Sequence, residues 1–209
     1  MERILAIGAH PDDIEIGCGG TLTKLITKGY YVMMLIVSNG QNWEGKNPNV
    51  RIEEQKKACD KLNIKDVIFL GQKDGEIKAS PRLNDAIEKI IIENNIDTVF
   101  SHYFEDSHQD HVELSKSVQV ASRRCINYFM YESLTSINFH PNCYSDISKY
   151  SENKKAVLTC FESQLEKYNK RKHNLIEYSS AKDKLNGIKS GVEFAEGFYA
   201  RKCLLDSIR

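Results

Sequence analysis

Two short polar segments of this chain carry side chains whose types and spacing could do chemistry. His10, Asp12 and Asp13 follow an apolar run at residues 4–8, and residues 108–111 (His-Gln-Asp-His) follow another apolar run much later. Imidazoles and carboxylates are poor material for a hydrophobic core, because each must be paired when it is buried. They are good ligands and bases. The two segments therefore indicate a metal site with a base beside it, provided that they meet in space.

Three of these side chains would form a set of two histidines and one carboxylate. His10, Asp13 and His111 suit a zinc ion that keeps an open coordination position for a water. Zinc catalysis needs that position, because the pKa of the bound water falls to roughly 7. The same ligand types accept Fe²⁺. We therefore predict a Zn²⁺ cofactor, with Fe²⁺ as the alternative ion.

The neighbouring polar residues are predicted to be catalytic. Asp12 lies next to a ligand and could act as general base toward a water. His108 lies one helical turn before His111, and its protonated imidazole could stabilise an oxyanion. Asp110 lies between these two histidines and could orient and charge His108.

The elements around the two segments predict an α/β fold. Buried apolar strands alternate with helical patterns, which is typical of βαβ units with right-handed crossovers. We expect a Rossmann-like, doubly wound, mostly parallel sheet flanked by helices, in one domain over residues 1–209. In the commonest order the first and fourth strands are neighbours, and ligands collect at that switch point. The predicted strands are residues 4–8, 31–37, 66–70, 97–101 and 127–131, and the predicted helices are residues 21–28, 51–62, 81–94 and 151–171. Residues 136–145 look irregular, and residues 172–186 could be helix or loop.

The bulk properties exclude several classes of function. The chain has 29 Lys plus Arg and 29 Asp plus Glu, and this balance argues against non-specific nucleic-acid binding. No apolar stretch is long enough for a membrane span, and the N-terminus does not resemble a signal peptide, so we expect a cytoplasmic protein. The six cysteines are scattered without a CxxC pair, which predicts reduced structural thiols rather than a cysteine zinc site.

The two polar segments also match a known family. The chain resembles the PIG-L/LmbE-like N-acetylglucosaminyl deacetylases at residues 9–22, 51–54 with Ala58, 108–111 and 194–198. This resemblance implies a Rossmann-like fold and the zinc-dependent removal of an acetyl group from a small-molecule amino sugar. It also implies the ligand and catalytic roles given above. Relatives commonly assemble, so a homo-oligomer is expected.

The second motif departs from the family pattern. Gln109 stands where the family usually has proline, and Ser107 stands where many relatives have arginine. Both positions affect the local loop and the contacts to the distal part of the substrate. The four residues that would do chemistry are still present.

Four further residues are candidates for substrate binding. Arg51 opens a helix near the site and could contact a sugar hydroxyl or an anionic group. Trp43 and Asn42 lie in the loop at residues 38–50 and could form a stacking wall for the sugar. His140 lies in a late loop that could reach the cleft, although an ordinary loop histidine is the simpler interpretation.

Other residues have a structural interpretation that competes with a functional one. His102 is interpreted as a structural residue or a pocket wall, and Glu15 as either a group near the metal or the exposed start of a helix. The glycines at residues 17–20 do not match the GxGxxG spacing of a dinucleotide site, so we interpret them as allowing close packing of helix on sheet.

Two rival functions remain at this point. One is a related zinc amidohydrolase that acts on another N-acylated substrate. The other is a catalytically silent sugar-binding protein. The presence of every expected catalytic and ligand residue counts against the second rival, and a panel of N-acylated substrates would separate the first from an amino-sugar deacetylase.

Overall fold

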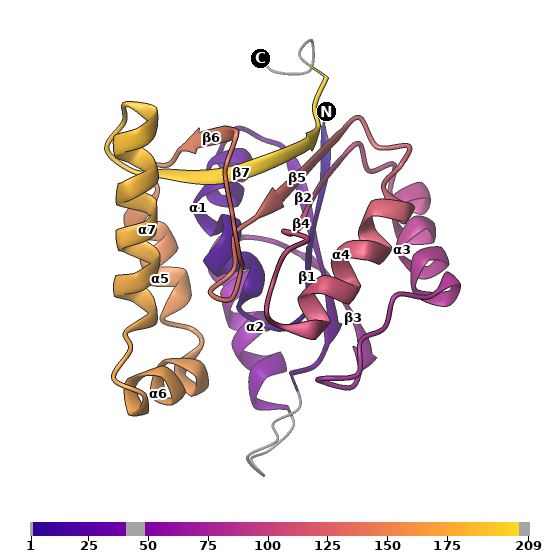
Figure 1. The fold of residues 1–209 in the computed structure, drawn as a ribbon, viewed down its shortest axis with the longest axis horizontal. Coiled ribbons are helices and arrows are strands. Elements are labelled where there is room, and N and C mark those ends of the chain that lie inside the picture. Colours follow the sequence, from indigo (N-terminus) through magenta and orange to yellow (C-terminus); the bar gives the residue numbers. More distant parts are fainter. Residues whose placement is uncertain (1, 41–48, 205–209) are drawn as a thin grey trace.

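A computed structural model describes residues 2–40 and 49–204. The described residues form a sheet of seven strands in the order β3-β2-β1-β4-β5-β7-β6 (Figure 1). The strands are β1 (Arg3–Gly8), β2 (Tyr31–Ser38), β3 (Asp66–Gln72), β4 (Thr98–His102), β5 (Asn127–Tyr131), β6 (Cys143–Asp146) and β7 (Ala195–Lys202). The helices are α1 (Asp13–Thr27), α2 (Val50–Leu62), α3 (Pro81–Glu93), α4 (Gln109–Ala121), α5 (Ser151–Leu158), α6 (Glu162–Lys170) and α7 (Leu175–Ser190).

The sheet confirms the predicted doubly wound α/β architecture. Strands β1 to β5 pair in parallel, and β1 lies between β2 and β4. The winding direction reverses between β1 and β4, as expected, so the segments that follow these two strands emerge at the same edge of the sheet. Among the strands of the described residues, β7 alone runs opposite to β1–β5, and it pairs antiparallel with both β5 and β6.

Helices cover both faces of the sheet. Along β1, Leu5 and Ile7 pack in the core under α3 and α4, whereas Ile4 and Ala6 pack in the core under α1 and α2. A strand that is buried on both faces reads as a continuous apolar run, which explains why β1 is recognisable from sequence. Figure 1 shows α3 and α4 on one side of the sheet, and α1, α2 and the group α5–α7 on the other.

Helix α1 starts earlier than the sequence predicts. The prediction began this helix at Thr21, after the run of glycines, but α1 begins at Asp13 and includes those glycines, which on their own disfavour a helix interior. Close packing is the reason: a Cβ on Gly17 would overlap the Tyr131 ring of β5, and one on Gly20 would lie 2.8 Å from Ile147 Cδ1. The interpretation of these glycines as sites of close packing is therefore confirmed.

A kink at Cys18 divides α1 and is stabilised by a buried charge cluster. Cys18 has a non-helical φ of −146°, which leaves backbone amides in the next turn without helical partners. The amides of Gly20 and Thr21 donate to the Glu196 carboxylate at 2.9 and 2.7 Å. Lys154 Nζ lies 2.7 Å from Glu196 and 2.8 Å from Asp183. We call the group of Lys154, Asp183 and Glu196 the lysine cluster.

The C-terminal third differs most from the prediction. The single helix predicted over residues 151–171 is two helices, α5 and α6. The break arises because Phe161 is fully buried in the core, and because Glu54 of α2 accepts hydrogen bonds from the Ser163 amide and hydroxyl, both at 2.7 Å. Of the region left open at residues 172–186, residues 175–186 belong to α7, and part of the irregular loop at residues 136–145 is β6.

Two properties expected from the composition can be compared with the structure. All six cysteines lie in the described part of the chain and are free thiols. Within residues 2–40 and 49–204, none of the helices has the length and apolar character that crossing a membrane would require.

Candidate active site

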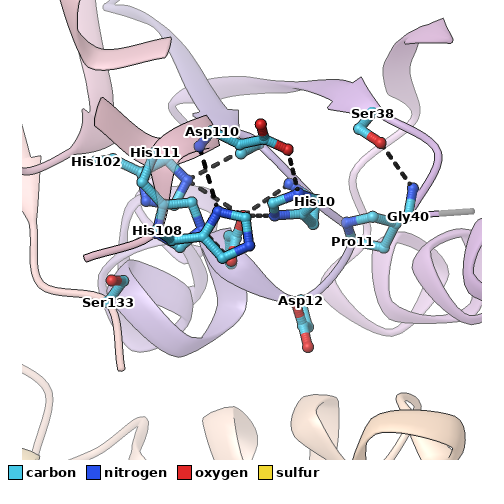
Figure 2. Close-up of polar contacts among 12 residues, drawn as sticks. His10, Pro11, Asp12, Ser38, Gly40, His102, His108, Asp110, His111 and Ser133 are labelled. Carbon is cyan, nitrogen blue, oxygen red and sulfur yellow. Dashed lines mark hydrogen bonds and ion pairs between the residues drawn. The ribbon is translucent and has the colours of Figure 1, made fainter. Parts of the chain in front are cut away.

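The two polar segments meet at the carboxyl edge of the sheet, beyond β1 and β4. His10 follows β1, and Asp13 is the first residue of α1. His108 precedes α4, where its Nδ1 accepts a hydrogen bond from the Asp110 amide at 3.3 Å, and His111 lies in the first turn of that helix. Figure 2 shows the rings of His10, His108 and His111 gathered in one group.

Three candidate ligands surround one position. The two Asp13 carboxylate oxygens face the two histidines: Oδ2 lies 3.3 Å from His10 Nδ1, and Oδ1 lies 3.5 Å from His111 Nε2. One donor atom from each residue lies within 4.8 Å of the other two. We call His10, Asp13 and His111 the ligand cluster. All three side chains are buried, at 5%, 8% and 4% exposure.

One buried nitrogen of this cluster indicates that a cation fits there. His111 Nε2 makes no hydrogen bond to any residue in the described part of the chain. The opposite ring nitrogen, Nδ1, lies 3.2 Å from Asp106 Oδ2 and 3.4 Å from Thr135 Oγ1. A histidine that donates through one nitrogen to a carboxylate presents the lone pair of the other, as metal-binding histidines do. His111 thus presents Nε2 toward Asp13.

His10 is held in the same way from the opposite side. Its Nε2 lies 3.0 Å from Asp110 Oδ2 and 3.0 Å from Asp74 Oδ1, which leaves Nδ1 directed at Asp13. One carboxylate and two imidazoles that are oriented by further carboxylates are a donor set that suits Zn²⁺ or Fe²⁺. The residues present therefore fit a divalent ion.

The electrostatics of the cluster also favour positive charge. Burial lowers the pKa of His111, but the Asp13 and Asp106 carboxylates outweigh it and raise this pKa to about 9. Burial raises the pKa of Asp13, yet His111 and His102 hold it well below its usual range. The protein thus keeps an ionised carboxylate beside two imidazoles that would otherwise take up protons, and a bound cation would replace those protons.

Asp12 has a different environment from Asp13. Its carboxylate points away from the histidine rings (Figure 2), and its Oδ1 lies 3.0 Å from Arg51 Nη2. Burial raises the pKa of Asp12 to about 6, although Arg51 opposes the shift. The Arg51 guanidinium also donates to the Pro11 carbonyl and packs against Gly40, where a Cβ would lie 2.7 Å from Arg51 Nη1. Arg51 is therefore fixed beside the candidate base.

A cavity of about 150 Å³ opens over these groups. Helix α6 and the segment after β5 form the wall facing the ligand cluster, so part of the site comes from the C-terminal third. The lining residues are His10, Asp12, Asp13, Ile16, Arg51, Asp74, His108, His111, Ser133, Leu134, Thr135, Gln164, Lys167 and Tyr168.

The relation between Asp110 and His108 differs from the expected one. Asp110 Oδ2 contacts His10 rather than the His108 ring, and the carboxylate also accepts the amides of Gly75 at 2.8 Å and Ile77 at 3.2 Å. These amides turn the carboxylate toward the segment after β3. The His108 ring instead stacks on His111 with centroids 4.6 Å apart, and burial together with neighbouring imidazoles lowers its pKa.

The structure also places the other residues named from the sequence. His102 is fully buried, accepts the Ala9 amide at 3.1 Å through Nε2 and stacks on His111, which agrees with a structural role. Glu15 is fully buried, so its interpretation as an exposed helix start is wrong. His140 is exposed and is not among the residues that line the cavity. Trp43 and Asn42 lie outside the described residues.

Sequence reasoning missed two carboxylates that hold the ligand cluster. Asp74 follows β3 and contacts His10, and Asp106 lies two residues before His108 and contacts His111. Asp74 could have been found, because β3 belongs to the same parallel sheet and ends at the same edge. Asp106 carries a weaker signal, since an aspartate in a polar loop is most often a turn residue.

Comparisons with known proteins identify the family. The model of the PIG-L family, described as GlcNAc-PI de-N-acetylase, matches residues 5–122. The chain is 34% identical over 156 residues to YaiS, an uncharacterized deacetylase of Escherichia coli. The matched region covers 70% of this chain and 82% of YaiS. The chain therefore belongs to the PIG-L family, and the resemblance seen in its motifs is confirmed.

Two further proteins that are similar to this chain carry out different reactions, as their names state. A probable N-acetyl-α-D-glucosaminyl L-malate deacetylase of Bacillus cereus is 34% identical over 138 residues, or 59% of this chain and 63% of that protein. The crystal structure of GalB, a 4-carboxy-2-hydroxymuconate hydratase of Pseudomonas putida, has a TM-score of 0.84 and 18% identity and covers 98% of both chains. At that identity the likeness concerns the fold alone, so the reaction has to be argued from the site.

Proposed function

We propose that this protein is a metal-dependent N-deacetylase that removes the acetyl group from an N-acetylglucosamine-type sugar in a small glycoconjugate. One observation carries the proposal: the ligand cluster, the buried Asp12 carboxylate and His108 border the same cavity. Family membership and the deacetylases among its relatives support the amino-sugar substrate.

His10, Asp13 and His111 would hold the ion, and the choice of Zn²⁺, with Fe²⁺ as the alternative, rests on this donor set. When bound, the ion supplies Lewis-acid chemistry, which polarises an amide carbonyl and acidifies a water. Asp106 and Asp74 keep the two imidazoles oriented for this task.

The remaining residues supply proton transfer and charge stabilisation. Asp12 takes a proton from the attacking water, and the partly buried Arg51 holds the Asp12 carboxylate beside the cavity. His108, which borders the same cavity, stabilises negative charge on the former carbonyl oxygen. The proton taken by Asp12 is finally passed to the departing amine, so that acetate and a free amino sugar are produced.

The test is acetate release from a panel of N-acylated compounds by the zinc- and iron-loaded protein. The panel should include N-acetylglucosamine linked to an acid, a nucleotide, a lipid or a second sugar, together with N-acyl amino acids. Release of acetate from amino sugars is the expected result. Hydrolysis of the non-sugar amides alone would instead indicate a different amidohydrolase. Sugar binding without any hydrolysis would indicate a silent binding protein.

Three expectations from the sequence stay predictions. They are a cytoplasmic location, assembly into a homo-oligomer, and the organisation of residues 1–209 as one domain. Substrate-binding roles for Arg51, Trp43, Asn42 and His140 also stay predictions, and among the described residues of this set Arg51 borders the cavity.

A further inference from the structure

The backbone of the candidate base has a conformation that needs support. Asp12 has φ 96° and ψ −26°, in the left-handed region that residues with a side chain rarely adopt. Such residues cost free energy and persist only where the surrounding contacts hold them. At Asp12 this conformation directs the carboxylate away from the ligand cluster, while Asp13, the next residue, faces it.

Helix α2 contacts the Asp12 segment through two residues on one face. Arg51 and Gln55 are four residues apart and therefore neighbours on the helix surface. Arg51 holds the Asp12 carboxylate and the Pro11 carbonyl. Gln55 Oε1 accepts a hydrogen bond from the Asp12 amide at 3.3 Å. The side chain and the backbone of Asp12 are thus held by different residues of the same helix.

The orientation of the Gln55 amide is fixed by the acceptors around its Nε2, of which Glu15 is the nearest and the sulfurs of Met34 and Cys59 lie at 3.6 Å. Gln55 Nε2 donates to Glu15 Oε1 at 2.6 Å, and both side chains are fully buried. With the amide flipped, an NH₂ group would face the Asp12 N–H, and two donors would oppose each other. Glu15 therefore keeps the Gln55 oxygen directed at the Asp12 backbone. This task also accounts for a carboxylate that is buried in α1 without touching the ligand cluster.

We propose that Gln55, anchored by Glu15, is a positioning residue that holds Asp12 in its left-handed conformation and so aims the general base. The inference rests on the proposed function, because it assigns Asp12 the role of base. Gln55 is absent from the residues that line the cavity, so its effect on catalysis passes through the Asp12 backbone.

The test compares Gln55→Met with Gln55→Glu in the metal-loaded full-length protein. Met fills a similar volume but leaves the Asp12 amide without an acceptor. We expect kcat to fall by about 10- to 100-fold, the cost of a small misplacement of a reacting group, while KM and the metal content stay unchanged. Gln55→Glu keeps an oxygen for the Asp12 amide and, as the neutral acid, a donor to Glu15. It should recover most of the lost kcat.

Cys59→Ala is the matched control for packing. Cys59 lies one turn further along α2, and its Sγ accepts a long hydrogen bond from Gln55 Nε2 at 3.6 Å, but it has no hydrogen bond to Asp12. The variant removes this sulfur contact and leaves the hydrogen bonds of Gln55 with Asp12 and Glu15 in place, so it should keep kcat. An equal loss of kcat in Cys59→Ala and Gln55→Met would overturn the inference, as would a Gln55→Met protein that loses its metal or changes only KM.

A structural readout separates this inference from the proposed function. If the wild-type protein hydrolyses no member of the panel, the proposed function fails, but the backbone claim can still be tested. Crystal structures of the wild type and Gln55→Met should show Asp12 leaving the left-handed region in the variant. An Asp12 that keeps its φ near 96° and its carboxylate position without Gln55 contradicts the inference, whatever the activity.

Discussion

The ligand cluster and the lysine cluster are both groups of buried charged residues, yet they differ in whether their polar atoms all have hydrogen-bond or ion-pair partners. In the lysine cluster, Lys154 lies within 2.8 Å of both of its carboxylate partners, and Glu196 also accepts two backbone amides. In the ligand cluster, His111 Nε2 has no hydrogen-bond partner among the described residues, and all three side chains border a cavity.

This difference separates a structural cluster from a functional one. The exposed fraction does not separate them, because the residues of both clusters are buried: those of the lysine cluster are 1–3% exposed and those of the ligand cluster 4–8%. A buried charge whose partners are complete holds elements together, here α5, α7, β7 and the kinked α1. A buried set of donor atoms that lies next to a cavity, and in which one nitrogen has no hydrogen-bond partner, can bind an ion and a substrate. Substitutions in the two clusters should therefore have different effects.

The largest effect is expected from removing the carboxylate of the ligand cluster. Asp13→Ala should abolish metal binding and lower kcat/KM by about 10³-fold or more, because a metal Lewis acid supplies several kcal/mol of transition-state stabilisation. Metal analysis after gel filtration, together with the acetate assay, measures both changes. A variant that keeps a full equivalent of metal would show that Asp13 is not a ligand.

A large but separable effect is expected at the neighbouring carboxylate. Asp12→Asn should keep the metal and lower kcat by about 10²–10⁴-fold, the usual contribution of a general base. Measured side by side, Asp12→Asn and Asp13→Ala should therefore differ in metal content. If both variants lose the ion, Asp12 is a ligand and the assignment of the base is wrong.

The lysine cluster should respond in stability instead of catalysis. Lys154→Met leaves two buried carboxylates without their cation and should cost about 3–5 kcal/mol of unfolding free energy. Urea unfolding measures it, and the folded fraction should keep its metal. Lys155→Met is the control, because Lys155 pairs with the exposed Glu152 and should contribute less than about 1 kcal/mol. Equal costs for the two variants would contradict a structural role for the cluster.

The smallest effect concerns the packing of α1, the helix that links the two clusters. Gly17→Ala should destabilise the protein by about 1–3 kcal/mol, because its Cβ would overlap the Tyr131 ring. Gly19→Ala should be neutral or stabilising by about 1 kcal/mol, since its Cβ would lie 3.6 Å from the nearest atom, in Lys154. Thermal unfolding compares them, and the same sign for both would argue against tight packing at Gly17.

The part of the fold that the sequence predicts best is also the part that carries the ligand cluster. Strands β1, β2 and β4 are buried on both faces, so their apolar runs are nearly continuous and the parallel sheet follows from them. The proximity of His10 and His111 then follows from the strand order alone. The predicted ligands could be named for this reason, although their roles stay predictions.

Tertiary contacts decide the rest, and local sequence does not record them. Helix α6 begins anew because Glu54, far away in the chain, binds the Ser163 amide. Two glycines of α1 are needed inside the helix because Tyr131 packs closely against Gly17 and Ile147 packs closely against Gly20. Gln55 could not be selected from sequence either, since the role proposed for it depends on its hydrogen bond with the Asp12 amide, 43 residues away in the chain. β7 was missed because its sequence carries charged residues at both ends of a short apolar run, and its pairing partners are distant in the chain.

The function proposed for this site requires that His10, Asp13 and His111 share one metal ion. The most direct measurement is anomalous X-ray scattering at the zinc edge from crystals of the zinc-loaded protein. We expect one strong peak about 2.0–2.2 Å from His10 Nδ1, an Asp13 oxygen and His111 Nε2. A peak held by His108 and Asp110 without His111, or no peak between these three side chains at full zinc loading, would contradict it.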